Sequence, residues 1–267
     1  MTETLKTDLY DIVSDTNIPW DKLKDSVILI TGATGLIGGM LIRALSEANK
    51  QRCLNLQIIA CGRNREIGDK LTQVTDANFI YHDIRNSSLL TEITGSIDYI
   101  IHCAAITKSA DMVARPVDVM TTEVNGTQSI LRLAQEKGCR SVVYLSSMEV
   151  YGQGLSGNID ETNLGYIDLS NPRSCYPVSK RFCEMMCISY TVQHNIPVKI
   201  ARLAQTFGAG TPQNDTRVFA QFARSSINGE NIILHTDGKS RGNYCYTSDT
   251  VRGLLTILTK GENSATY

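Results

Sequence analysis

Two residues four positions apart, Tyr176 and Lys180, carry the clearest chemical potential in this sequence of 267 residues. Apolar side chains follow them at helical spacing, which predicts a helix with both residues on one face. A free tyrosine has a pKa of about 10 and is a weak base at neutral pH, but an adjacent ammonium or an oxidised nicotinamide favours the phenolate. Such a phenolate can take the proton of an alcohol whose carbon loses a hydride.

A serine is placed to assist this reaction. The apolar run Ser141–Ser147 predicts a buried strand that ends in Ser146-Ser147. At the carboxyl end of that strand, the hydroxyl of Ser147 would hold the reacting oxygen by a hydrogen bond. The sequence therefore predicts a catalytic group of Ser147, Tyr176 and Lys180.

The hydride needs an acceptor, and a glycine-rich turn predicts where one binds. The turn lies between a predicted strand, Val27–Ile30, and a predicted helix that includes Met40–Leu45. We expect Gly32 to allow the tight turn, Gly35 to let backbone approach a pyrophosphate, and Gly38 to let the helix pack closely on the strand. The predicted cofactor contacts in this turn are Gly32, Thr34, Gly35, Leu36, Ile37 and Gly38.

The next two strands bear on which dinucleotide binds. A strand over Leu56–Cys61 is followed by Gly62-Arg63, where an acid would bond the ribose 2′-hydroxyl of NAD and an arginine can accept the 2′-phosphate of NADP. Because Arg63 can also stack on adenine, the choice stays open. After the strand Phe79–His82, Asp83 and its neighbour Ile84 are expected at the adenine, and capping of the strand end is the alternative role for Asp83.

A fourth strand, Ile97–His102, is followed by Cys103, Ala104 and Ala105, whose small side chains leave room for a cofactor against the backbone. His102 invites a catalytic role, but at the end of a buried strand we expect a hydrogen-bonded core residue instead.

Strands and helices thus alternate along the chain, with a further helix over Pro116–Lys137 and a sixth strand over Val198–Leu203. This order predicts an α/β fold, a Rossmann-type doubly wound parallel sheet with a smaller C-terminal substrate lobe. We divide the chain into an N-terminal helical arm (1–26), a dinucleotide-binding domain with the catalytic helix (27–204) and a substrate lobe (205–267) that is interleaved with the last elements of the sheet. The arm is expected to be anchored by Trp20, and a loop is expected over Gly152–Pro172.

Bulk composition narrows the function classes. The 26 basic and 27 acidic residues nearly cancel, so neither a nucleic-acid nor an anionic-membrane surface is indicated. The eight cysteines are scattered through apolar runs, and His194 falls off any standard zinc spacing with Cys183 and Cys187, so we expect reduced buried thiols and no metal site. We see neither a signal peptide nor a membrane-spanning run and expect a cytoplasmic protein.

Several of these motifs occur together and in order in one known family. The chain resembles the extended short-chain dehydrogenase/reductases of the NAD-dependent epimerase/dehydratase family, which modify nucleotide-activated sugars. The resemblance covers residues 24 to 267. It rests on Thr31 to Gly38, Asp83-Ile84-Arg85, His102 to Ala105, Ser146 to Gly152, Tyr176 to Lys180, and Tyr246-Thr247-Ser248-Asp249.

The resemblance implies that Ser147, Tyr176 and Lys180 are catalytic, that Lys180 also contacts the nicotinamide ribose, and that the first step oxidises sugar C4 to a transient ketone. Related 4,6-dehydratases carry Asp-Glu where this chain has Met148-Glu149, and a thioether has no proton to give. The Ser-x-Glu arrangement resembles nucleotide-sugar decarboxylases, in which the glutamate assists the oxidised intermediate. A 4-epimerase is equally open, and Glu149 could instead only position the loop.

Further positions depart from the family pattern. Glu123 stands where the family usually has Asn, three residues before Gly126-Thr127. The arginine expected seven residues before Asp249 is Gly242, with Arg241 one place off. The residues predicted to contact substrate are Gln205, Arg217 and Arg241. Gln205 stands where the family often has Asn. Family members run on beyond Tyr267, so we expect either an incomplete substrate lobe or a naturally short protein.

We expect NAD as cofactor, because a redox-neutral cycle returns the hydride, with NADP not excluded by Arg63. A nucleotide-sugar substrate and a homodimer are the expected partners, the latter through the helix face around Met185, Met186 and Cys187, unless that stripe is core. Two alternatives remain: an NADPH-dependent nucleotide-sugar reductase, and a catalytically silent dinucleotide-binding protein.

Overall fold

The computed structural model describes residues 2–86, 93–234, 237–238 and 241–267. Its centre is a sheet of six parallel strands in the order β3-β2-β1-β4-β5-β6, as the alternation of strands and helices predicts. The strands are β1 (Val27–Thr31), β2 (Gln57–Gly62), β3 (Asn78–Tyr81), β4 (Tyr99–His102), β5 (Ser141–Ser147) and β6 (Val198–Leu203). The order reverses between β1 and β4, and ligands of such sheets bind beside the carboxyl ends of the strands at this point.

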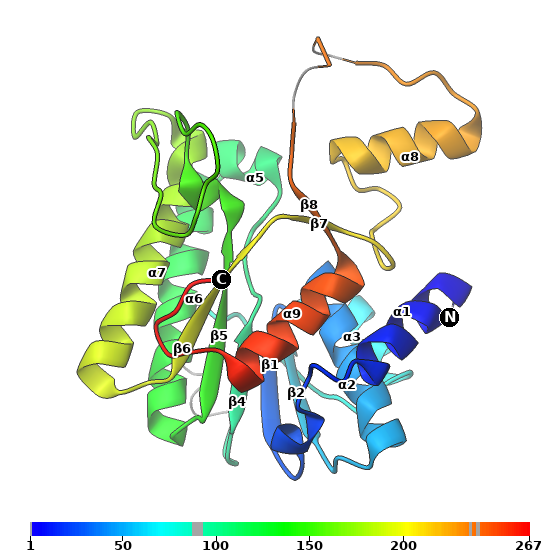
Figure 1. Ribbon diagram of the computed structural model, residues 1–267, viewed down its shortest axis with the longest axis vertical. Helices are drawn as coiled ribbons and strands as arrows, with labels where there is room; N and C mark the ends of the chain where they lie inside the picture. The colour runs from blue at the N-terminus through cyan, green and yellow to red at the C-terminus, as the bar shows by residue number, and fades with distance from the viewer. Residues whose placement is uncertain (1, 87–92, 235–236, 239–240) are drawn as a thin grey trace.

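Helices cover both faces of the sheet (Figure 1). They are α1 (Glu3–Ser14), α2 (Leu36–Arg52), α3 (Arg65–Thr72), α5 (Ser109–Ala114), α6 (Pro116–Lys137), α7 (Cys175–His194), α8 (Val218–Asn228) and α9 (Thr247–Lys260), with short 3-10 turns η1 (Trp20–Leu23), η2 (Met148–Tyr151) and η3 (Pro172–Ser174). The bounds predicted for α6 are confirmed, because Pro116 fits the first helical turn and Gly138 caps the end with φ +63°.

The alternation of side chains along the buried strands divides the core in two. Ile28 and Ile30 of β1 pack under α1, α2 and α9, whereas Leu29 between them packs under α6 and α7. This explains why the strand reads as an unbroken apolar run, since a parallel strand is buried on both faces.

The N-terminal segment packs on the α2 and α9 side of the sheet. The expected helical arm contains α1, whose Leu9 and Ile12 are buried. Trp20 is also buried, and its indole N–H donates to the carbonyl of Asp15. The Asp15 carboxylate lies 2.6 Å from Arg252 of α9. The N-terminal segment is therefore tied to the C-terminal helix, and Trp20 is an anchor as expected.

Beyond β6 the chain forms a small lobe that projects from the sheet (Figure 1). It contains a two-stranded parallel sheet of β7 (Gln205–Phe207) and β8 (Tyr244–Tyr246), together with α8. Phe207 contacts three other aromatic rings of the lobe, those of Phe219, Tyr244 and Tyr246. The chain then returns through α9 to the main sheet, where α9 packs on β5 and β6.

Some predicted boundaries and one predicted surface are wrong. β4 begins at Tyr99 rather than Ile97, and β3 ends at Tyr81 rather than His82. The predicted shared face of Met185, Met186 and Cys187 does not exist, because successive helical residues point about 100° apart. Met185 is 61% exposed, whereas Cys187 is 1% exposed in the core.

The glycine turn permits an unusually close approach of α2 to the sheet. Gly32 has φ +65°, and a Cβ there would lie 2.7 Å from the backbone N of Ala104 after β4. A Cβ on Gly38 would lie 2.4 Å from the carbonyl oxygen of Gly32. Both contacts are with backbone that cannot rotate away, so the predicted roles of Gly32 and Gly38 are confirmed.

His102 links β1, β4 and α6 in the core, as expected of a structural residue. Its Nδ1 lies 2.6 Å from Thr31 Oγ1, and its Nε2 lies 3.4 Å from Thr127 Oγ1. Burial lowers the pKa of His102 to about 3, with a further contribution from the Lys180 ammonium. The imidazole is therefore neutral in the folded protein.

The close packing at Gly38 can be tested against its neighbour. We expect Gly38→Ala to lower the free energy of unfolding by about 1–3 kcal/mol because the new methyl overpacks fixed backbone. Gly39→Ala is the matched control, since its Cβ would meet no atom closer than 3.7 Å. The control should be neutral or stabilise the helix by up to about 1 kcal/mol. Equal unfolding midpoints in urea for both variants would contradict the packing argument.

The neutral His102 predicts a pH dependence of stability. Below the ordinary histidine pKa of about 6.5, only the unfolded chain protonates His102, so the free energy of unfolding decreases as the pH is lowered. This decrease stops near pH 3, where the histidine of the folded protein also becomes protonated. Between pH 6 and 4, wild type should lose roughly 2.5 kcal/mol more than His102→Gln. Urea unfolding at several pH values measures this, and parallel curves for the two proteins would refute it.

Candidate active site

The structure brings the three predicted catalytic residues together at the carboxyl end of β5. Tyr176 lies in the first turn of α7 and Lys180 one turn later, and both are buried. Ser147 lies near the phenol of Tyr176 and lowers the pKa of that phenol. The Lys180 Nζ lies 5.6 Å from the centre of the Tyr176 ring. A phenol, a hydroxyl that can orient it and an ammonium therefore occupy one site.

Opposing charges set the state of the phenol. Burial raises the pKa of Tyr176, the Lys180 ammonium lowers it, and the Glu123 carboxylate raises it again. The net direction is upward from about 10, so Tyr176 carries its proton at neutral pH in the protein alone.

Lys180 is held by contacts that the sequence did not reveal. Its Nζ lies 2.9 Å from the Glu123 carboxylate and donates to the carbonyl of Leu145 at 2.7 Å. The same Nζ lies 4.8 Å from the centre of the Tyr144 ring. The position of Glu123, three residues before Gly126-Thr127, marks it in the sequence as a departure from the family pattern. Nothing in the sequence identifies Lys180 as its partner.

Glu149 lies next to the site in η2. Its backbone N–H donates to Ser147 Oγ at 3.2 Å, while its carboxylate receives two hydrogen bonds from Arg173 at 2.8 and 2.9 Å. Arg173 comes from η3, directly before the catalytic helix, and was not singled out in the sequence. The pair joins the segments that carry Ser147 and Tyr176.

The glycine turn has the shape that a dinucleotide requires. Gly35 caps α2 without any side-chain hydrogen bond, so no side chain of the turn covers the first N–H groups of the helix, near Leu36 and Ile37. Thr34 packs against Gly62, where a Cβ would lie 3.2 Å from it. The backbone of Ala104 lies against Gly32 on the β4 side. A pyrophosphate fits a helix N-terminus of this kind, and the residues present therefore suit the cofactor.

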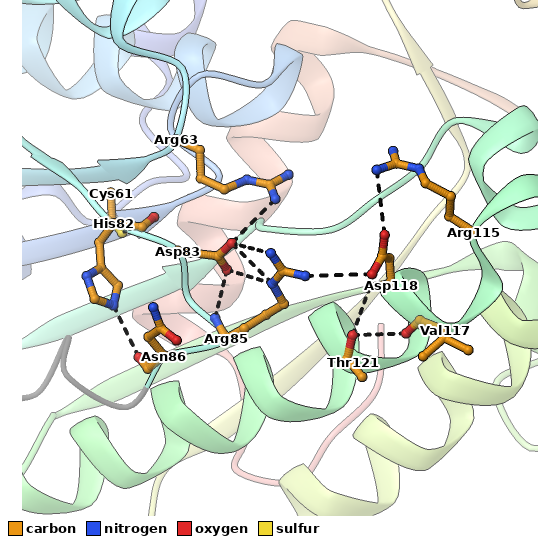
Figure 2. Close-up of polar contacts among 10 residues, drawn as sticks. All are labelled: Cys61, Arg63, His82, Asp83, Arg85, Asn86, Arg115, Val117, Asp118 and Thr121. Atoms are coloured by element: carbon orange, nitrogen blue, oxygen red, sulfur yellow. Dashed lines mark hydrogen bonds and ion pairs between the residues drawn. The ribbon is translucent and has the colours of Figure 1, made fainter.

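At the outer end of this edge, charged side chains form a chain of ion pairs, shown in Figure 2. Asp83 pairs with Arg63 at 3.6 Å and with Arg85 at 2.7 Å, and Arg85 continues to Asp118 at 3.9 Å. The hydrogen bonds from Arg85 lower the pKa of Asp83 to about 2 although burial opposes them. Asp83 also accepts the backbone N–H of Arg85, which is the capping role considered for it.

A cavity of about 310 Å³ adjoins these ion pairs and is lined by Arg63, Arg85, Ala105, Ile106, Thr107, Lys108, Asp111, Arg115 and Asp118. Two predicted cofactor residues, Arg63 and Ala105, thus line the same cavity as Lys108 and Arg115, which the sequence does not single out. Ile84 is buried beside the cavity region, where its side chain packs on Gly126 of α6. The cysteine after β4, Cys103, is partly buried.

The predicted substrate residues lie in the small lobe. Gln205 begins β7, and its Oε1 is buried without a hydrogen-bond partner among the described residues. Arg217 precedes α8 and is bound to the Asp215 carboxylate and to the carbonyl of Thr206. Arg241 and Gly242 lie exposed before β8. The structure thus places Gln205 and Arg217 near each other and leaves Arg241 on the surface.

The cysteines are all free, and five of them are buried. Cys53 departs from the expectation of buried thiols, because it ends α2 in the left-handed conformation and is exposed. Within the described ranges, no group of three His, Cys, Asp or Glu side chains could hold a metal ion. The helices of the same ranges are too short or too polar to cross a bilayer.

Known proteins are similar to this chain in sequence. UDP-glucuronic acid decarboxylase 1 of Danio rerio is 28% identical over 237 residues, which are 89% of this chain and 55% of that protein. UDP-glucuronic acid decarboxylase 5 of Arabidopsis thaliana is 30% identical over 231 residues, 86% of this chain and 66% of that protein. The chain therefore spans about half to two thirds of the length of these relatives.

Solved structures agree on the fold. A dTDP-glucose 4,6-dehydratase from Streptomyces venezuelae, solved with NAD bound, superposes with a TM-score of 0.77 at 25% identity over 90% of this chain and 74% of that one. UDP-glucose 4-epimerase from Thermotoga maritima gives 0.77 at 22% identity over 90% and 75%. The family model of the NAD dependent epimerase/dehydratase family matches residues 28–267. With its Rossmann-type sheet, its glycine turn and its Ser-Tyr-Lys group, the chain belongs to the NAD dependent epimerase/dehydratase family.

Proposed function

We propose that this chain is an NAD-dependent enzyme that oxidises a nucleotide sugar transiently at C4 and completes the cycle by decarboxylation or epimerisation. One observation carries the proposal: Tyr176 and Lys180, one helical turn apart on α7, lie beside Ser147 at the sheet edge that also holds the glycine turn. Family membership and the relatives named above support the same reaction class.

In this mechanism Tyr176 takes the proton of the C4 hydroxyl while Ser147 holds the oxygen of that hydroxyl by a hydrogen bond. NAD, when bound, supplies the acceptor for the hydride and the positive charge of the oxidised ring. Because Tyr176 is protonated in the protein alone, it becomes a base only when further positive charge favours the phenolate. When the hydride returns to the sugar, Tyr176 gives the proton back.

The turn from Gly32 to Gly38 would hold the pyrophosphate of NAD, and the edge beside Arg63 and Asp83 would hold the adenosine. Asp83 stays charged above about pH 2, so a 2′-phosphate near Arg63 would meet a carboxylate as well as a guanidinium. This arrangement favours NAD over NADP. The alternative of an NADPH-dependent reductase, which rested on Arg63, has less support because that side chain is already paired with Asp83.

The fate of the ketone depends on the residues after Ser147. Met148 has no proton with which to expel water, which argues against dehydration. Glu149 lies beside Ser147 with its carboxylate bound to Arg173, and we assign to it the assistance of an oxidised intermediate. Relatives named as UDP-glucuronic acid decarboxylases support decarboxylation of a UDP-uronic acid. A 4-epimerase is the second candidate, because Ser147 and Tyr176 alone suffice for it.

The remaining assignments follow from this proposal. The small lobe of β7, β8 and α8 would contact the sugar nucleotide through Gln205 and Arg217. The intact Ser-Tyr-Lys group argues against a catalytically silent dinucleotide-binding protein. Free thiols throughout the cysteine set support a cytoplasmic location, where disulfides are rare.

We also propose a homodimer formed through α7. Its outward side presents Phe182, Met185 and Val192, which are 53%, 61% and 78% exposed and recur at the spacing of one helical stripe. Neighbouring α6 adds exposed Val117 and Met120. Large apolar side chains gathered along packed helices are typical of subunit interfaces.

The catalytic proposal predicts a large loss of turnover when the hydroxyl of Tyr176 is removed. Tyr176→Phe should lower turnover by at least about 100-fold, since it removes the general base, while NAD binding remains. Products from UDP-glucuronic acid and from UDP-glucose are separated by chromatography and identified by mass. Loss of carbon dioxide indicates a decarboxylase, and conversion to UDP-galactose indicates an epimerase. Tyr190→Phe, at the far end of the same helix, is the matched control, and undiminished turnover by Tyr176→Phe would defeat the proposal.

The dimer proposal predicts that a charge in the α7 stripe separates the subunits. Phe182→Glu should sediment as a monomer in analytical ultracentrifugation at micromolar concentration, whereas wild type sediments as a dimer. Tyr10→Glu places the same charge on α1, at a residue that is 65% exposed, and should leave the dimer intact. A wild-type chain that is monomeric throughout would exclude this interface.

A further inference from the structure

A buried carboxylate contacts the catalytic ammonium of this chain. Glu123 lies in the middle of α6 and is fully buried, and its Oε2 is 2.9 Å from Lys180 Nζ. Its other oxygen, Oε1, has no hydrogen-bond partner among the described residues. Burial raises the pKa of the Glu123 carboxyl, and the Lys180 ammonium opposes that rise, so the pairing with Lys180 is what favours the ionised form of Glu123 there.

The contacts of Lys180 leave little of its hydrogen-bonding capacity for a cofactor. An ammonium has three donors. One points to Glu123 and one to the carbonyl of Leu145. A single N–H therefore remains for the ribose of a bound cofactor, and the side chain is fixed before the cofactor arrives.

The groups that face Lys180 from other elements do not alter this balance. His102 of β4 is neutral because burial lowers its pKa to about 3. Cys103 stays a thiol because burial raises its pKa to about 12, and burial likewise raises the pKa of Tyr144 in β5. On α7 itself, burial raises the pKa of the Cys183 thiol to about 11 and also raises that of Cys187. Among these groups only Glu123 opposes the ammonium with a full charge.

We propose that Glu123 is a positioning residue that neutralises Lys180, so that deprotonation of Tyr176 depends on the positive charge of the oxidised nicotinamide. The inference rests on the proposed function, because it assigns Lys180 and Tyr176 to an NAD site. In the protein alone the Glu123–Lys180 pair has no net charge and offers the phenol little help. Oxidised NAD adds one positive charge, and its reduction removes that charge, so the base forms only in the complex that can accept a hydride.

The proposal has a direct test in the relative affinity for the two forms of the cofactor. Glu123→Gln leaves one uncompensated positive charge in the site, which disfavours NAD⁺ but not NADH. At pH 6.5 the ratio of the dissociation constants of NAD⁺ and NADH should rise roughly tenfold, the equivalent of one pKa unit. The acid limb of the pH profile of kcat should move about one unit lower, because the carboxylate no longer opposes the phenolate. Fluorescence titration and steady-state kinetics measure the two effects.

Three further variants separate charge from simple loss of structure. Glu123→Asp keeps the carboxylate and should keep the wild-type ratio. Glu184→Gln removes another buried glutamate of α7, which pairs with Arg202 at 2.7 Å. This variant should lower stability without changing the ratio of the two dissociation constants. The double variant Glu123→Gln/Lys180→Met has no net charge, so its ratio should return to the wild-type value even if Glu123→Gln alone fails to fold.

The outcomes distinguish this inference from the proposed function. An unchanged ratio in Glu123→Gln, or a raised ratio in the double variant, would overturn the role of Glu123 even if sugar turnover and its dependence on Tyr176 are intact. A wild-type chain that binds neither NAD⁺ nor NADH would overturn both. Turnover that ignores Tyr176→Phe, combined with the expected change in ratio, would overturn the catalytic proposal alone.

Discussion

The constraint on which the site depends is the close approach of α2 to β1 and β4 at the glycine turn. Gly32 and Gly38 leave no space for a Cβ, and each meets rigid backbone rather than a movable side chain. This approach brings the N-terminus of α2 to the point where the strand order reverses, between β1 and β4. The predicted catalytic residues of β5 and α7 lie along the same edge, so the proposed cofactor site and the proposed site of the reacting hydroxyl share one end of the sheet.

Most of the secondary structure was predictable because short stretches of sequence determine it. Pro116 and Gly138 mark both ends of α6, and the apolar runs mark the six strands, since fully buried parallel strands contain few polar residues. The Ser-Tyr-Lys group was predictable because the four-residue spacing on a helix fixes the relative position of Tyr176 and Lys180. Strand ends were less predictable, because pairing with neighbouring strands sets them. Asp98, for example, lies outside β4, and its carboxylate accepts the backbone N–H of Val27.

The charged partners of the site were not predictable from the sequence, because they depend on tertiary contacts between distant segments. Glu123 reaches Lys180 across the packed α6 and α7 helices, and Arg173 reaches Glu149 across the loop between η2 and η3. The expected face of Met185, Met186 and Cys187 failed for a different reason, since adjacency along a helix is not adjacency on its surface. Spacing within one element is therefore a sounder guide than residue type.

The tie between the two ends of the chain has a consequence for synthesis. Leu41 and Leu45 of α2 belong to the same core as Val251, Leu254 and Leu258 of α9, and Asp15 binds Arg252. A nascent chain that has already produced the whole central sheet still leaves this side of α2 uncovered until α9 leaves the ribosome. Contacts of such long sequence separation form late and slowly. The core around α2, although that helix is encoded early, is therefore completed only after α9 has been synthesised.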